Sequence, residues 1–110
     1  MKFLFIDDDG NWLNSLKRCL TRGKDNIVMS ECHSLEEALM AIDNNKPEVV
    51  FVDHRLTENG SEGLEIVKRI KGVKFYSTTA SSELVKVYAE YGVEWVGKTD
   101  LKKLMSIISG

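Results

Sequence analysis

The chain has 110 residues, which is enough for one domain with one hydrophobic core. Its 43% hydrophobic and 29% charged residues are typical of globular proteins, and its net charge of -2 argues against a nucleic-acid-binding domain. No apolar run approaches the roughly 20 residues of a membrane-spanning helix. Cys19 and Cys32 are too far apart to indicate a zinc site, so residues 1–110 are predicted to form one cytoplasmic domain.

The first third of the chain alternates between strand and helix patterns. Residues 3–6 are continuously apolar, as expected for a strand that is buried on both faces. Residues 11–22 have apolar side chains at helical spacing, with Cys19 predicted to be a small core residue and Gly23 predicted to end the helix. Residues 27–29 predict a second strand.

The middle of the chain repeats this alternation. Ser34 is predicted to cap a helix that runs to Asn45, and Glu37 is predicted to complete a capping box with Ser34. Pro47 prevents the helix from continuing. Residues 49–52 are rich in β-branched side chains and are the strongest strand prediction.

The last third predicts two more strands and three helices. The helices are expected at residues 63–71, then from Ser81 or Ser82 to Tyr91, and then after a cap at Thr99. The strands are expected at residues 73–77 and 93–96. Strands that alternate with helices at this spacing predict right-handed βαβ units and one parallel sheet, hence an α/β fold.

Polar residues follow four of the predicted strands. Because the carboxyl ends of parallel strands lie along one edge of a sheet, these side chains are expected to lie close together. Neighbouring carboxylates repel one another, and a bound Mg²⁺ ion would relieve that repulsion through oxygen ligands. A nearby ammonium and hydroxyl would complete a site for a phosphoryl group. The residues concerned are Asp7, Asp8, Asp9, Asp53, Thr78, Thr79 and Lys98.

In this order and at these strand ends, the residues resemble the receiver domain of two-component response regulators. The resemblance covers essentially the whole chain and implies a (βα)5 doubly wound fold. It also implies a five-stranded parallel sheet in the order 2-1-3-4-5, with helices on both faces. The expected function is phosphoryl acceptance in signalling rather than enzymatic turnover, with at most self-phosphorylation from small phosphodonors and autodephosphorylation. The expected partner is a sensor histidine kinase or a phosphotransfer protein, and no membrane contact is expected.

The resemblance assigns a role to each residue of the acidic site. Asp53 looks like the phosphoacceptor. Asp8 looks like a direct Mg²⁺ ligand, and Asp7 looks like a ligand through water or a supporting partner of the site. Arg55, two residues after Asp53, would lend its backbone carbonyl to the metal.

The resemblance also assigns the switch residues. Thr79 looks like the switch hydroxyl, and Ala80 after it is small enough to leave the phosphoryl pocket open. Lys98 looks like the lysine that pairs with the phosphoryl group. Trp95 sits where the family often has a mobile aromatic side chain, so rearrangement near it would alter a surface that a partner reads.

The chain departs from the family pattern in three places. Thr57 stands where a proline is common, and the Glu62–Gly63 pair comes about two residues late, which lengthens the polar surface loop at residues 55–62. Lys98 is followed by Thr99 rather than by a cis proline, so a trans bond is expected there.

Several polar and aromatic residues have a structural interpretation that competes with a functional one. Asp9 is expected to cap a helix rather than bind metal. His54 is expected to be a solvent-facing loop histidine. At least one of Tyr88, Tyr91 and Trp95 is expected to fill the core rather than form a switch or docking surface.

Two alternative functions stay open at this point. The Asp7–Asp8–Asp9–Gly10 run also resembles the first motif of haloacid-dehalogenase-type phosphatases, with Asp7 as nucleophile, Asp9 as acid/base and Lys98 as the lysine. That reading lacks a later acidic pair, and it predicts turnover of phosphate esters. The other alternative is a degenerate receiver that serves only as a protein-interaction module.

Overall fold

The computed structural model describes residues 1–20, 25–79 and 81–110, so the predicted roles of Gly23 and Ala80 lie outside the described residues. Within them, five strands form one parallel sheet in the order β2-β1-β3-β4-β5. The predicted α/β fold and its strand order are therefore confirmed. The strands are β1 (Phe3–Asp7), β2 (Ile27–Glu31), β3 (Val49–Val52), β4 (Lys74–Ser77) and β5 (Glu94–Trp95).

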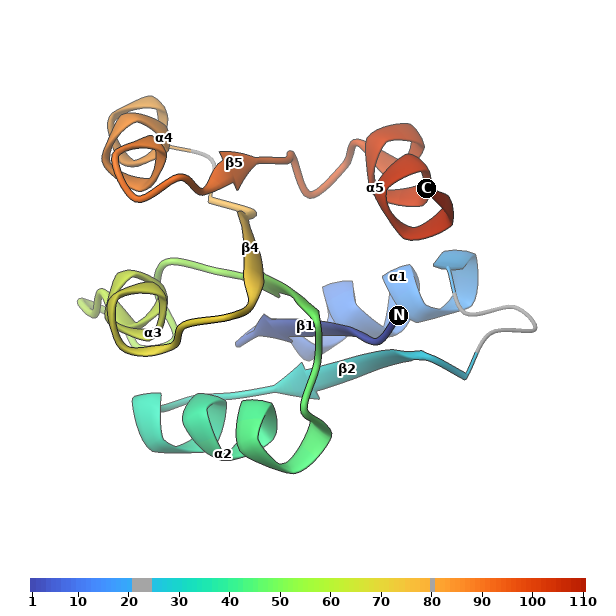
Figure 1. The fold of residues 1–110 in the computed structure, drawn as a ribbon, viewed down its shortest axis with the longest axis horizontal. Helices are drawn as coiled ribbons and strands as arrows, with labels where there is room; N and C mark the ends of the chain where they lie inside the picture. Colours follow the sequence, from blue (N-terminus) through green and yellow to red (C-terminus); the bar gives the residue numbers. More distant parts are fainter. Residues whose placement is uncertain (21–24, 80) are drawn as a thin grey trace.

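The helices cover both faces of this sheet. Figure 1 shows α1 and α5 together on one side of the strands, with α2, α3 and α4 on the other. None of the helices in the described ranges has the length and apolar character that a membrane span needs. The helices are α1 (Gly10–Leu20), α2 (Leu35–Asn45), α3 (Glu62–Arg69), α4 (Ser82–Ala89) and α5 (Leu101–Ser109).

The central strands divide the core into two layers. Every residue of β1 and β3 is buried, which explains why residues 3–6 and 49–52 are continuously apolar rather than alternating. Leu4 and Val50 pack with the layer under α2, α3 and α4, whereas Phe5 and Phe51 pack with the layer under α1 and α5. The rings of Phe5 and Phe51 stack with their centroids 4.2 Å apart. Burial of each such side chain stabilises the fold by about 1.5–3 kcal/mol.

Helix caps follow the sequence prediction at three helices and differ at one. Asp9 Oδ1 accepts hydrogen bonds from the backbone N–H groups of two α1 residues, and Ser34 and Ser81 cap α2 and α4. The predicted cap at Thr99 is wrong, because the Asp100 carboxylate accepts the bond from the Lys103 N–H. Thr99 and Asp100 both have side chains that can act as an N-cap, and the helix begins one residue later than predicted.

Two further expectations need correction. Glu37 does not complete a capping box on Ser34 itself, because its carboxylate accepts a hydrogen bond from the His33 N–H, one residue earlier. Cys19 is exposed rather than a core residue, since the buried face of α1 is formed by Leu13, Leu16 and Leu20.

The strand register places the residues of the predicted site at one edge of the sheet. Val52 is paired with Ile6 on one side and with Ser77 on the other. The ladder continues one residue further, because the Asp53 N–H donates to the Ile6 carbonyl and the Thr78 N–H donates to the Val52 carbonyl. Asp53 therefore leaves the sheet between the ends of β1 and β4.

His54 is buried and paired, which overturns the prediction of a solvent-facing histidine. Only 8% of His54 is exposed, and its Nδ1 lies 2.8 Å from the hydroxyl of Tyr88, which is itself fully buried. Tyr88 thus confirms that one of the three aromatic residues fills the core. Burial lowers the pKa of His54 and raises that of Tyr88, so both groups stay neutral at pH 7.

Gly63 allows α3 to approach this pair. A Cβ atom at Gly63 would lie 2.3 Å from the Asp53 carbonyl oxygen and 2.6 Å from the Tyr88 hydroxyl oxygen. The Gly63 N–H donates to the His54 carbonyl at 3.0 Å. The segment after Asp53 is therefore held between the start of α3 and the buried face of α4.

We expect Tyr88→Phe to destabilise the fold by about 1–3 kcal/mol, because it leaves the buried His54 ring without its partner. Urea unfolding followed by circular dichroism measures this loss. The matched control is Tyr91→Phe, which removes a hydroxyl from a side chain that is 48% exposed and should leave stability unchanged. Equal stability of the two variants would contradict a structural role for the His54–Tyr88 bond.

Candidate functional site

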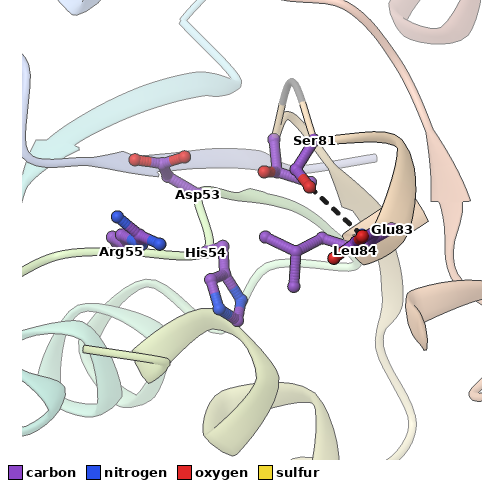
Figure 2. Close-up of a pocket in the computed structure, with 7 residues that line it drawn as sticks. Asp53, His54, Arg55, Ser81, Glu83 and Leu84 are labelled. Carbon is purple, nitrogen blue, oxygen red and sulfur yellow. Dashed lines mark hydrogen bonds between the residues drawn. The ribbon is translucent and has the colours of Figure 1, made fainter. Parts of the chain in front are cut away.

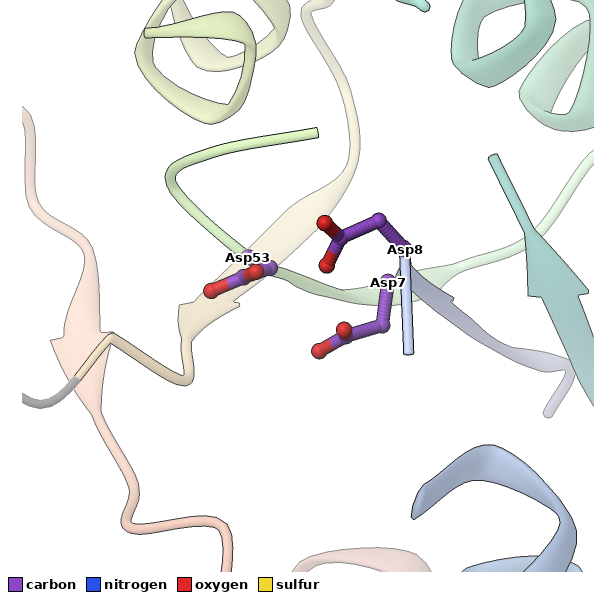
Figure 3. A group of neighbouring side chains, drawn as sticks. All are labelled: Asp7, Asp8 and Asp53. Atoms are coloured by element: carbon purple, nitrogen blue, oxygen red, sulfur yellow. The ribbon is translucent and has the colours of Figure 1, made fainter. Parts of the chain in front are cut away.

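Three carboxylates meet where β1 and β3 end. Oxygen atoms of Asp7, Asp8 and Asp53 all lie within 4.8 Å of one another. Figure 3 shows the three side chains directed into the same space from the ends of these two strands. The structure therefore brings together acidic residues that are separated by more than forty positions in the sequence.

Lys98 reaches this cluster from the segment after β5. Its Nζ lies 2.7 Å from Asp7 Oδ2 and 3.7 Å from Asp53 Oδ1. Burial alone lowers the pKa of Lys98, but the Asp7 contact and the charge of Asp53 outweigh burial and raise it. The site thus contains a permanent positive charge beside two carboxylates. The Lys98–Thr99 peptide bond is trans, as expected.

Asp7 is the inner member of the cluster. It is fully buried, and its Oδ1 accepts a hydrogen bond from the Asp9 N–H at 2.9 Å. Apart from the Lys98 ion pair, Asp7 Oδ2 has no hydrogen-bond partner among the described residues. Burial raises the pKa of Asp7, while Lys98 and the bond from Asp9 act against that rise. Asp7 is inaccessible to a substrate, and the Asp9 carboxylate caps α1, so the geometry does not fit the phosphatase alternative.

Asp53 is the half-buried member of the cluster, between the buried Asp7 and the exposed Asp8. Its side chain is 15% exposed, and the residue lines two cavities. Burial and the neighbouring charge of Asp7 raise its pKa to about 6, although Lys98 acts in the opposite direction. Without a bound cation, the ionised form of Asp53 is therefore disfavoured in this site. A bound cation would favour the ionised form.

The donor set fits a hard divalent cation. All three side chains offer carboxylate oxygens, and one buried oxygen of Asp7 lacks a hydrogen-bond partner in the described part of the chain. Mg²⁺ prefers oxygen ligands and keeps several waters, so it needs few protein groups. The sequence-derived expectation of a cation site is thus compatible with the chemistry of the residues present.

A cavity of about 500 Å³ opens beside Asp53. Figure 2 shows Asp53 and Arg55 on one side of it, with Ser81 and the first turn of α4 on the other. The side chains of Arg55 and Ser81 both line this cavity, whereas the role of the Arg55 backbone carbonyl stays a prediction. The opening is large enough to admit a small phosphorylated group to Asp53.

A second cavity, of about 530 Å³, lies between Asp53 and the β5 end. Thr79 lines both cavities and is 7% exposed. The indole N–H of Trp95 donates to the Thr79 backbone carbonyl, so Trp95 contacts the segment that carries the predicted switch hydroxyl. Trp95 is 40% exposed as a residue, and its backbone carbonyl accepts a hydrogen bond from Lys103 Nζ. A movement of Thr79 would therefore be transmitted directly to the partly exposed Trp95.

Hydrogen bonds to Glu62 hold the loop at residues 55–62 that follows Asp53. The Glu62 carboxylate accepts hydrogen bonds from the Leu56 N–H at 3.0 Å and from the Thr57 hydroxyl at 2.7 Å. Burial raises the pKa of Glu62, but these bonds outweigh it and lower the pKa below its ordinary value. Leu56 is 2% exposed, so the predicted surface loop is anchored in the core at this point.

Sequence reasoning missed two residues near the site, Trp12 and His54. Trp12 contacts Lys98, whose position is 86 residues away, and the helical pattern of α1 marks Trp12 only as an apolar residue. His54 directly follows Asp53, but its partner Tyr88 comes from α4. A contact between distant elements leaves no periodic signal in the sequence.

Comparisons with known proteins agree with this geometry. Relatives include the sensory transduction protein LytT of Bacillus anthracis, 36% identical over 72 residues, or 64% of this chain and 29% of that protein. LytT of Bacillus subtilis is 30% identical over 74 residues, or 67% of this chain and 30% of that protein. This chain thus spans less than a third of the length of these relatives.

Solved structures share the fold. The N-terminal domain of an uncharacterized protein from Wolinella succinogenes has a TM-score of 0.81 at 21% identity, covering 99% of this chain and 90% of that one. The BeF3-activated N-terminal receiver domain of Klebsiella pneumoniae RstA has a TM-score of 0.73 at 18% identity, covering 99% and 96%.

A family model matches almost the whole sequence of this chain. Residues 3–106 match the family model of the response regulator receiver domain, so the match extends from the first strand into the last helix. This is a family of signalling domains rather than of classical enzymes. With the strand order and an acidic edge in place as well, the chain belongs to the response regulator receiver domain family.

Proposed function

We propose that this chain accepts a phosphoryl group on Asp53 and thereby switches a surface that a partner protein reads. The observation that supports this proposal is the position of Lys98, whose ammonium lies 2.7 Å from Asp7 and 3.7 Å from Asp53. A positive charge there, beside a partly exposed carboxylate, suits an anionic phosphoryl group. Phosphoryl transfer depends mainly on positioning and charge neutralisation, and this site offers both.

Mg²⁺ would be held by Asp8 and Asp53, with Asp7 and the backbone carbonyl of Arg55 in support. When bound, it would neutralise negative charge on the phosphoryl oxygens. The same charge would offset the effects of burial and of the neighbouring Asp7, which together raise the pKa of Asp53 to about 6. Asp53 would then be ionised at neutral pH, as a nucleophile must be.

The reaction is a direct transfer from a phosphohistidine of the partner. An Asp53 carboxylate oxygen attacks the phosphorus, an acyl phosphate O–P bond forms and the N–P bond to the imidazole breaks. The imidazole leaves with the electron pair of that bond and takes up a proton from solvent. Lys98 stabilises the negative charge on the transferred group throughout.

The switch follows from Thr79 and Trp95. The Thr79 hydroxyl would hydrogen-bond the new acyl phosphate, which biases an equilibrium between two existing conformations. Because the Trp95 indole N–H donates a hydrogen bond to the Thr79 carbonyl, movement of this segment would shift Trp95, a residue that is 40% exposed. The surface around Trp95 would then differ between the two states.

The proposed donor is a sensor histidine kinase or a phosphotransfer protein in the cytoplasm. The relatives named above are called sensory transduction proteins and are more than three times as long as the matched segment. An effector region in the same polypeptide, or a separate output partner, would read the switched surface. No nucleic acid or membrane contact is assigned to residues 1–110.

The test is incubation of the chain with Mg²⁺ and acetyl phosphate, followed by intact mass measurement. We expect a gain of about 80 Da, the mass of one phosphoryl group, that maps to the peptide with Asp53 and disappears when EDTA replaces Mg²⁺. An unmodified chain would instead indicate a degenerate receiver that acts through protein contacts alone. An adduct on another peptide would refute the assignment of Asp53.

A further inference from the structure

Trp12 contacts Lys98 in two ways. Its indole N–H donates a hydrogen bond of 3.2 Å to the Lys98 backbone carbonyl. The Lys98 Nζ also lies over the Trp12 ring, 5.0 Å from the ring centroid. A cation within about 6 Å of an indole centroid is attracted by the negative face of the ring. One side chain therefore holds both the backbone and the ammonium of Lys98.

Trp12 is itself fixed to the acidic turn. Its backbone N–H donates to Asp9 Oδ1 at 3.1 Å, and Asp9 in turn donates its own N–H to Asp7. The ring meets Phe5 edge-on, at 6.4 Å between centroids, on the buried side of α1. Trp12 thus links the end of β1 to the segment after β5.

Lys98 lies on a part of the chain with little regular structure. β5 contains only Glu94 and Trp95, and α5 begins at Leu101. A lysine side chain has several rotatable bonds, and 32% of this one is exposed. Without a lateral contact, the ammonium would exchange between the carboxylates and solvent.

We propose that Trp12 is a positioning residue, which holds the Lys98 ammonium beside Asp7 and Asp53 before a phosphoryl group arrives. This inference rests on the proposed function of Lys98 in pairing with the phosphoryl group. In this arrangement the Trp12 side chain acts through Lys98, by its hydrogen bond to the backbone carbonyl and its ring under the ammonium, rather than on the reacting atoms. A lysine that is already in place accelerates transfer because less ordering is needed in the transition state.

The competing explanation is that Trp12 only fills the core under α1. The two roles separate in a double-mutant cycle with Lys98, measured as the rate of adduct formation with Mg²⁺ and acetyl phosphate. We expect Trp12→Leu to slow the native rate about tenfold, and to slow the Lys98→Met protein by less than about twofold. Trp12→Phe replaces the indole by a smaller aromatic ring and loses the N–H, so its rate should lie between those of Trp12→Leu and the native chain. Equal slowing by Trp12→Leu in both backgrounds would overturn the proposal.

The matched packing control is Tyr76→Leu. The Tyr76 ring packs against the same core layer and stacks on Phe51 at 5.2 Å, and its ring contacts among the described residues are with Phe51 and Lys74 rather than with Lys98. Its loss should leave the rate within about twofold of the native chain, while thermal unfolding shows a comparable loss of stability. A tenfold slowing by Tyr76→Leu would mean that core packing alone explains the effect of Trp12.

A spectroscopic measurement tests the contact independently of phosphorylation. The chain has two tryptophans, so Trp95→Phe leaves Trp12 as the only indole emitter. In that background Lys98→Met should change the emission of Trp12, whereas Lys102→Met, which alters an exposed lysine on α5, should not. If the native chain forms no adduct, the proposed function fails, and unchanged Trp12 emission in Lys98→Met overturns the positioning contact separately.

Discussion

The Asp53→Asn protein is expected to form no adduct with Mg²⁺ and acetyl phosphate, whereas the native chain gains about 80 Da. Asparagine keeps the shape of the side chain, but its amide cannot form an acyl phosphate. Asp7 does not replace Asp53, since Asp7 is fully buried against Lys98, and the exposed Asp8 is proposed as a ligand of Mg²⁺ rather than as the nucleophile. Intact mass measurement after a fixed incubation reports the loss directly, and it requires no knowledge of the natural phosphodonor.

Asp9→Asn is the matched control for this prediction. It removes a negative charge from the same acidic run, but Asp9 serves as the cap of α1 and is outside the cluster of three carboxylates. Asparagine is as good an N-cap as aspartate, so the helix is preserved. The control should therefore keep most of the native adduct. An adduct of native size in Asp53→Asn would show that another residue accepts the phosphoryl group.

The fold could be predicted from the sequence because the central strands are unambiguous. Residues 3–6 and 49–52 are continuously apolar, and in the structure both runs are buried on two faces. The polar residues directly after them then fall at one edge, since parallel strands share the direction of their carboxyl ends. Asp7, Asp53 and Lys98 were therefore predictable as neighbours without any knowledge of their distances.

The pairings inside the site were not predictable in the same way. The Lys98 ammonium is closer to Asp7 than to Asp53, although the sequence indicates only that the three lie at one edge. His54 was misjudged because its partner, Tyr88, lies 34 residues further on, on a helix whose rotation the sequence does not specify. Trp12 was missed for the same reason.

The first residue of α5 could be predicted only to within one position. Thr99 and Asp100 both have side chains that can accept a hydrogen bond from a free N–H group, and both precede an apolar helical pattern. The choice between them depends on where the preceding backbone turns, which is set by Gly97, since its carbonyl accepts a bond from the Asp100 N–H. Local chemistry narrowed the cap to two residues, and tertiary structure selected one.

The crowding of carboxylates predicts a second large effect, on stability in metal-free solution. Burial and Asp7 raise the pKa of Asp53 from 3.8 to about 6. Between these pH values the folded chain binds more protons at Asp53 than the unfolded chain does, so its stability falls as pH rises. A difference of about two pKa units corresponds to roughly 3 kcal/mol, which is lost once the pH exceeds 6.

Asp53→Asn should remove this pH-dependent loss. In EDTA we expect the two proteins to be similarly stable near pH 4, and the variant to be more stable by about 2–3 kcal/mol at pH 7.5. Urea unfolding curves collected across this pH range measure the difference. Lys98 stays charged throughout this range because its pKa is raised, and the contributions of groups far from Asp53 largely cancel when one curve is subtracted from the other.

Mg²⁺ provides the control that links this stability difference to the proposed site. At pH 7.5 a cation that binds only the folded state stabilises it by mass action, and Asp53 is one of its proposed ligands. The ion should therefore stabilise the native chain more than Asp53→Asn, and the gap seen in EDTA should narrow or reverse. A stability difference that is constant from pH 4 to pH 7.5 would show that Asp53 is not held at a raised pKa. An equal gain for both proteins would instead show that Mg²⁺ binds without the Asp53 carboxylate.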